Sequence, residues 1–151
     1  MSELSCIKVD ENELKLMRYV KPSYIKNSEV ADEVFQLRED RMPPEEYLSF
    51  FHSMSETIEH KIQDVIAELK KRSFSIKKTC GFLYLDASKA SIEINLTNEI
   101  VEFKKCAYPK YGMYYLSEDI MDRIEAKAIL IHHSELHMNS EHSLYLSDVT
   151  K

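Results

Sequence analysis

The chain has 151 residues, of which 44% are hydrophobic and 30% are charged, so we expect residues 1–151 to form a single globular domain with a proper core. Because it holds only two glycines and four prolines, it is neither a low-complexity chain nor the carrier of a glycine-rich phosphate loop. A formal net charge of −6 makes it a poor general nucleic-acid binder, since phosphate contacts need clustered cations.

The N-terminal third of the chain predicts short elements. Hydrophobic residues alternate between Leu14 and Val20, which favours a strand. Residues 22–27 are typical of a turn, and Ser28 is placed to cap a short helix that ends near Leu37.

The clearest predicted element is a helix over residues 53–72. Its hydrophobic positions recur at spacings of three and four, which gives one hydrophobic stripe for core packing; they are Met54, Ile58, Ile62, Val65, Ile66 and Leu69. Ser53 and Glu56 have the spacing of a capping box at its start.

After Arg72 the period changes to alternation, which predicts a series of short strands. They lie at residues 74–76, 82–85, 92–96, 101–103, 128–132 and 143–146, with a helix at 117–125 among them. Because the connections are short, we expect neighbouring strands to pair as an antiparallel meander. The fold class is therefore α+β, with one long amphipathic helix packed on the meander and one or two short helices added.

Cysteines, charge and hydropathy bear on location and partners. No hydrophobic run approaches the roughly 20 residues of a membrane helix, and the N-terminus lacks a signal-peptide pattern. Cys6, Cys80 and Cys106 form an odd and scattered set that is typical of reduced thiols in the cytosol. Lysines and arginines number 7 against 13 acids over residues 1–60, 10 against 6 over 61–110, and 3 against 7 over 111–151. We therefore expect a cytoplasmic protein that makes no membrane contact and favours basic partners.

Four of the six histidines fall within eleven residues near the C-terminus, at His132, His133, His137 and His142. They could coordinate a transition metal, or one of them could act as a general base. The spacing matches no strong metal motif, and a strand over 128–132 would point the adjacent pair to opposite faces. Structural histidines are the third interpretation, and we expect neither a metal nor another cofactor.

His142 is the first histidine to consider in this cluster, because it precedes a predicted strand and follows Asn139, whose side chain can bond the backbone. Such a pair could brace a turn or aim a base at a ligand. His142, Asn139, His137 and His133 are therefore the candidate functional residues.

A second candidate region holds four tyrosines in eight residues, Tyr108, Tyr111, Tyr114 and Tyr115. Tyrosine-rich segments are favoured at protein interfaces, and they can also stack on bases. A strand whose tyrosines cover a sheet edge explains the pattern equally well.

Three early stretches, Val20-Lys-Pro-Ser-Tyr-Ile25, Val34-Phe-Gln-Leu-Arg38 and Glu46-Tyr-Leu-Ser49, resemble the opening of some small uncharacterised bacterial proteins. Those proteins also tend to close with an Asn-x-x-His step, here Asn139 to His142, although Ser140 stands where they usually have proline. The resemblance implies a bacterial cytosolic origin and transfers no activity or site.

We therefore expect a small binding or regulatory protein that acts through protein contacts. It would suit the role of an acidic partner of a basic toxin or nuclease, or of a small subunit in a bacterial multi-protein defence system, and it could also form a homo-oligomer. No nucleophile or nucleotide motif is present, so a non-catalytic role is favoured. The alternatives are an enzyme or ligand-binding domain that uses the histidines, for example in metal-assisted hydrolysis, and a single-stranded nucleic-acid binding protein.

Overall fold

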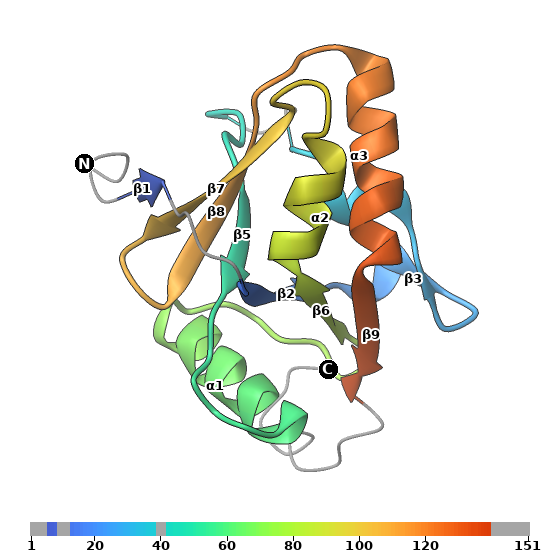
Figure 1. The fold of residues 1–151 in the computed structure, drawn as a ribbon. Coiled ribbons are helices and arrows are strands. Elements are labelled where there is room, and N and C mark those ends of the chain that lie inside the picture. Colours follow the sequence, from blue (N-terminus) through green and yellow to red (C-terminus); the bar gives the residue numbers. More distant parts are fainter. Residues whose placement is uncertain (1–5, 9–12, 39–41, 140–151) are drawn as a thin grey trace.

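The computed structural model describes residues 6–8, 13–38 and 42–139, and it shows an α+β fold (Figure 1). Six antiparallel strands and the short strand β1 form one sheet in the order β1-β7-β8-β5-β2-β6-β9. The strands of this sheet are β1 (Cys6–Lys8), β2 (Lys15–Val20), β5 (Leu48–Phe51), β6 (Gly81–Asp86), β7 (Val101–Cys106), β8 (Lys110–Tyr115) and β9 (Ser134–Met138). The helices are α1 (Ile58–Lys71), α2 (Ala87–Ile94) and α3 (Ile120–His132).

The sheet is antiparallel as expected, but it is not a meander. Within this sheet, as far as the structure describes it, β7 and β8 are the only strands that are both consecutive in sequence and paired, whereas β2 lies between β5 and β6. The strand order therefore depends on long-range pairing, which short connections cannot reveal.

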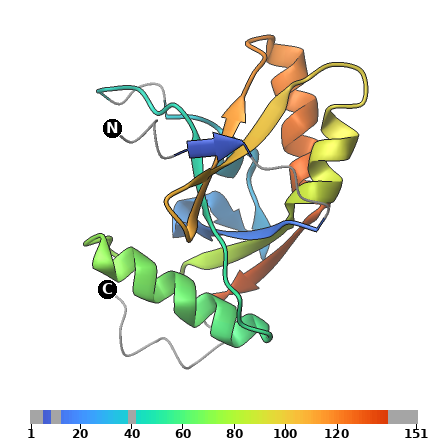
Figure 2. The ribbon, with the colours of Figure 1, turned by 60° about the vertical axis from the view of Figure 1, so that its left-hand side comes forward.

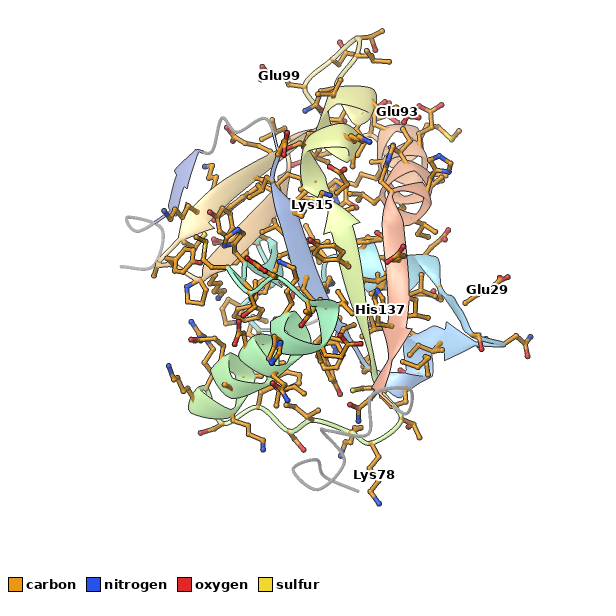
Figure 3. All side chains as sticks on the ribbon, turned by 60° about the horizontal axis from the view of Figure 1, so that its bottom comes forward. Lys15, Glu29, Lys78, Glu93, Glu99 and His137 are labelled. Carbon is orange, nitrogen blue, oxygen red and sulfur yellow. The ribbon has the colours of Figure 1, made fainter. Side chains whose placement is uncertain are left out.

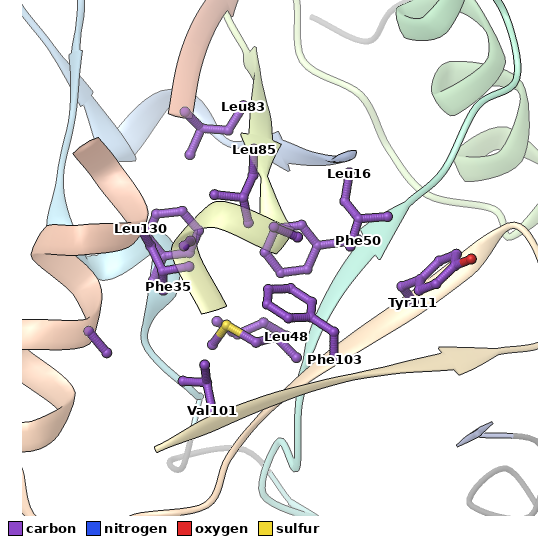
Figure 4. Close-up of a cluster of buried hydrophobic side chains, with 14 of the residues drawn as sticks. Leu16, Phe35, Leu48, Phe50, Leu83, Leu85, Val101, Phe103, Tyr111 and Leu130 are labelled. Atoms are coloured by element: carbon purple, nitrogen blue, oxygen red, sulfur yellow. The ribbon is translucent and has the colours of Figure 1, made fainter. Parts of the chain in front are cut away.

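Helices cover both faces of the sheet (Figure 2). On one face α1 buries the hydrophobic stripe that the sequence predicted, with Ile62, Val65, Ile66 and Leu69 inside. On the other face α2 and α3 cover the larger core, part of which Figure 4 shows around Phe50. Alternate residues of the central strands face the two cores, as strand geometry requires.

No single helix dominates the described chain, because α1 and α3 have 14 and 13 residues and α2 has 8. The expected start of α1 at Ser53 is wrong. Thr57 is the cap, and its side chain accepts a hydrogen bond from the backbone of His60. Met54 lies outside the helix and is exposed.

Two predicted strands are helical. The alternating Ile92 and Ile94 lie in α2, and Leu96 follows its end. At the start of this helix the Asp86 side chain is the cap and accepts a hydrogen bond from Lys89 N. The predicted strand over 128–132 is the second half of α3, which starts three residues later than expected, after Asp119.

The N-terminal predictions are confirmed in part. The strand before Val20 is β2, but the helix expected over residues 28–37 is wrong. Ser28 instead forms the turn between β3 (Ile25–Lys26) and β4 (Glu29–Val30), and the short 3-10 helix η3 (Asp32–Phe35) follows. A second 3-10 helix, η2 (Pro22–Tyr24), precedes the hairpin.

The cysteines differ from the expected set of three reduced thiols. Cys106 is disulfide-bonded, and the backbone register places Cys6 opposite it across the β1–β7 pair. Cys80 is free and fully buried, and burial raises the pKa of its thiol to about 12. Cys80 is therefore the inert core residue that its lack of a motif indicated. The strand predicted over 143–146 lies outside the described residues.

Candidate protein-binding surface

The described histidines do not converge on one site. His132 and His133 end α3, and their rings meet edge to face at 5.0 Å, so a helix end replaces the strand that was expected to separate them. His133 Nε2 lies 2.8 Å from Glu93 Oε1 on α2. His137 lies on β9 with its Nε2 3.0 Å from Glu135 Oε1, and Figure 3 shows Glu93 and His137 at separate places. His133 and His137 thus pair with different carboxylates.

Across residues 6–8, 13–38 and 42–139, no group of three or more histidine, cysteine or acidic side chains has the geometry to hold a metal ion. His142 lies outside these residues, so the pairing of His142 with Asn139 stays a prediction.

Asn139 braces the end of β9. It is fully buried, its Nδ2 donates to Lys78 O at 3.0 Å, and its backbone N–H donates to Cys80 O at 3.0 Å. Its Oδ1 is buried and accepts no hydrogen bond from the described residues. These bonds hold β9 against the segment before β6. The turn between Asn139 and His142 that the sequence analysis expected this pair to brace lies outside the described residues.

The four tyrosines do not form one exposed group. Tyr111 is buried in the core, and Tyr114 packs against Tyr47 with ring centroids 5.0 Å apart. Tyr108 is 49% exposed and its hydroxyl lies 2.9 Å from His52 Nδ1. The expectation of a shared tyrosine interface is therefore wrong for Tyr111, because this side chain serves the core.

Tyr115 has a structural partner of its own. Its hydroxyl donates to Phe35 O at 2.7 Å, and the guanidinium of Arg123 lies over its ring at 4.9 Å. Burial raises the pKa of Tyr115 well above its usual range. The residue ties η3 to β8 and forms one wall of a groove beside α3.

The most unusual surface of the described chain is the outer face of α3. Ala126 and Leu130 point into the core, and at 100° per residue the opposite face carries Ile120, Met121 and Ile124. These three side chains are 73%, 62% and 48% exposed. We call them the α3 stripe.

Exposed hydrophobic residues that occur singly need no explanation, but adjacent ones on one helix face mark interaction sites. A helix that is hydrophobic on both faces is normally buried on both. In the described structure only the inner face of α3 is covered, so the α3 stripe lacks a partner within this part of the chain.

A groove runs along one side of the α3 stripe. It encloses about 390 Å³ between α3 and the segment after η3; its walls are Gln36, Leu37, Tyr115, Ile120, Arg123, Ile124 and Lys127. Lys127 Nζ donates to Gln36 Oε1 at 3.0 Å across the groove. The stripe and groove together offer a hydrophobic centre with polar edges, which is the usual anatomy of a protein interface.

Acidic groups surround the start of the stripe. Glu118 and Asp119 precede it, and Asp122 and Glu125 flank it on α3. Asp119 and Asp122 are engaged locally, since Asp119 caps the helix and Asp122 accepts from Ser117 Oγ at 2.7 Å. The local balance is four acids against Arg123 and Lys127 over residues 118–127.

The sequence contained a signal for this surface. Met121, Ile124 and Ala128 recur at spacings of three and four, which is the pattern of a helix face, whereas the next position in the series, Ile131, packs against the core. Ending the predicted helix at residue 125 and assigning a strand to 128–132 hid the pattern.

No family model matches the chain, and no curated protein and no solved structure matches it either.

None of the described helices is long and hydrophobic enough to cross a bilayer.

Proposed function

We propose that this is a small protein-binding module whose contact surface is the α3 stripe with its groove. The disulfide at Cys106 removes the reduced thiols from which a cytosolic location was expected, so we do not propose one. One observation carries the proposal. Ile120, Met121 and Ile124 expose neighbouring hydrophobic side chains on a helix whose other face is already used by the core. Burying such a surface against a partner is favourable at about 25 cal/mol per Å² of hydrophobic area.

The partner we propose is a protein with a hydrophobic patch and a basic rim. Acids outnumber cations around the stripe, and the whole chain carries a net charge of −6. Opposite charge on a partner speeds encounter and selects against wrong partners, whereas two copies of this chain repel each other. A basic toxin, nuclease or effector, or a larger subunit of a multi-protein defence system, fits this description better than a homo-oligomer.

The test compares two identical substitutions on opposite faces of the sheet. Met121→Asp places a charge in the α3 stripe, and Met54→Asp places the same charge on an exposed methionine just before α1. Acids are favourable in the first turn of a helix, so Met121→Asp should leave the fold intact. Circular dichroism spectra that match the wild type would establish this for both variants.

Each tagged protein is then used to capture partners from the native host. We expect one stoichiometric partner on the wild type and on Met54→Asp, and its loss on Met121→Asp. Equal capture by all three proteins would place the interface elsewhere, and no stoichiometric partner on any of them would remove the proposal.

The described part of the C-terminal histidine cluster does not favour the enzyme alternative, because His133 and His137 each pair with a separate carboxylate. Metal analysis of protein purified without chelators tests the version of it that involves His142.

A further inference from the structure

A cavity opens where two central strands of the sheet separate. β2 and β5 share only one register pair, Met17 with Phe51, and beyond it the strands diverge. A cavity of about 520 Å³ lies at this point, bounded by β2, β5 and the end of α1. Its size is that of a small-molecule site.

Arg18 lines this cavity and bridges the separated strands. Its Nε donates to Val34 O at 2.8 Å and its Nη1 donates to Ser49 O at 2.9 Å. A guanidinium has five N–H donors, so three remain without an acceptor among the described residues. Burial lowers the pKa of Arg18, and the charge of Glu45 is the largest influence that opposes this. A partly desolvated cation with spare donors is a ready partner for an anion.

Among the described residues, three further cations line the same cavity, Lys21, Arg38 and Lys77, and one acid, Glu45. With Arg18 this makes four positive charges against one negative, in a protein whose overall charge is −6. The excess of positive charge is therefore local to this cavity. The cavity is concave, so the fields of its several charges add.

The cavity also has an aromatic wall. Phe74 is 43% exposed and packs its ring edge to face on Tyr19, with centroids 4.9 Å apart. The Tyr19 hydroxyl accepts a hydrogen bond from Lys77 N at 3.2 Å, which holds the loop after α1 against β2. Planar rings stack readily on an exposed aromatic side chain of this kind.

From this combination we infer that the cavity binds a small phosphate ester that carries a planar ring, of the nucleoside monophosphate class. The phosphate meets Arg18 and the lysines, and the ring stacks on Phe74. Guanidinium groups match phosphate geometry, and stacking supplies affinity without base selection. The cavity shares Gln36 with the groove beside the α3 stripe but contains none of the three stripe residues, so this inference does not depend on the protein-binding function.

The test uses variants that leave Arg18 in place, because Arg18 also holds β2 to its neighbours. Lys77→Gln removes one cavity charge and Phe74→Ala removes the stacking ring. Lys89→Gln, an exposed lysine on α2, is the matched control. Circular dichroism confirms that each variant folds.

Calorimetric titration of the full chain at low salt uses the four ribonucleoside monophosphates, with adenosine and ribose 5-phosphate as partial ligands. We expect at least one monophosphate to bind, weakened roughly three- to tenfold by Lys77→Gln, at least fivefold by Phe74→Ala, and unchanged by Lys89→Gln. Each partial ligand should bind more weakly than the monophosphate. Absence of binding at millimolar ligand, equal affinity for ribose 5-phosphate, or equal effects of Lys77→Gln and Lys89→Gln would overturn the inference.

Discussion

Replacing a buried and an exposed side chain of α3 by alanine should change the free energy of unfolding by very different amounts. Leu130 is fully buried between α3 and the sheet, so Leu130→Ala removes a core side chain and leaves a cavity. Such substitutions cost about 2–5 kcal/mol, which for a chain of this length lowers Tm by roughly 4–20 °C. Leu130 and Ala126 are the only fully buried side chains of α3 in the described structure, so this loss weakens the main attachment of the helix.

Ile124→Ala acts on the outer face, where the side chain is 48% exposed. Full burial of isoleucine is worth about 1.5–3 kcal/mol, and about half of that is realised here. Alanine keeps part of this contact and has a higher helix propensity, which offsets some of the loss. We therefore expect a cost of less than about 1 kcal/mol.

Urea unfolding followed by circular dichroism measures both variants against the wild type. Ile124→Ala should lower the free energy of unfolding far less than Leu130→Ala, and equal losses would contradict this expectation. That result would mean that the α3 stripe is covered within the chain itself and is not a free surface.

Three further predictions test other parts of the structure. Gly112→Ala should cost about 1–3 kcal/mol in a urea titration, because the added Cβ would lie 2.6 Å from Cδ1 of the Tyr47 ring; a neutral result would contradict this close packing. Hydrogen bonds from Ser53 and Ser55 lower the pKa of Asp64, so an NMR titration should show this pKa rising when both serines become alanine. The associated stability is present at neutral pH and is lost as the pH falls through the lowered pKa, and an unshifted pKa would remove this explanation. Alkylation of denatured protein without reductant should label one of the three cysteines and all three after reduction, whereas three labels before reduction would contradict the disulfide.

Local patterns predicted the fold where one element has one buried face. The sequence predicted the helix α1 because its hydrophobic residues lie on one face and its polar face is solvated. It predicted the strand β2 because hydrophobic residues alternate there. Ile92 and Leu96 misled because both are exposed, so their spacing reports no buried face. In α3 the run Ile129-Leu-Ile has no period of its own, and short hydrophobic runs do not distinguish strand from helix.

The binding surfaces were harder to predict for a physical reason. His132 and His133 stay together at the end of α3, whereas His137, only four residues further on, lies on β9 with a different carboxylate partner. The cationic cavity has the opposite origin, since residues from Arg18 to Lys77 come together only through strand pairing. Neither arrangement leaves a local trace in the sequence.

Site-specific photo-crosslinking in the native host tests the central claim most directly. A photoreactive amino acid replaces Met121 in one protein and Met54 in a second, and covalent adducts are identified by mass after illumination. We predict one defined protein adduct at position 121 and none at position 54. The absence of an adduct at position 121, or the same adduct at both positions, would contradict the claim that the α3 stripe is the partner-binding surface.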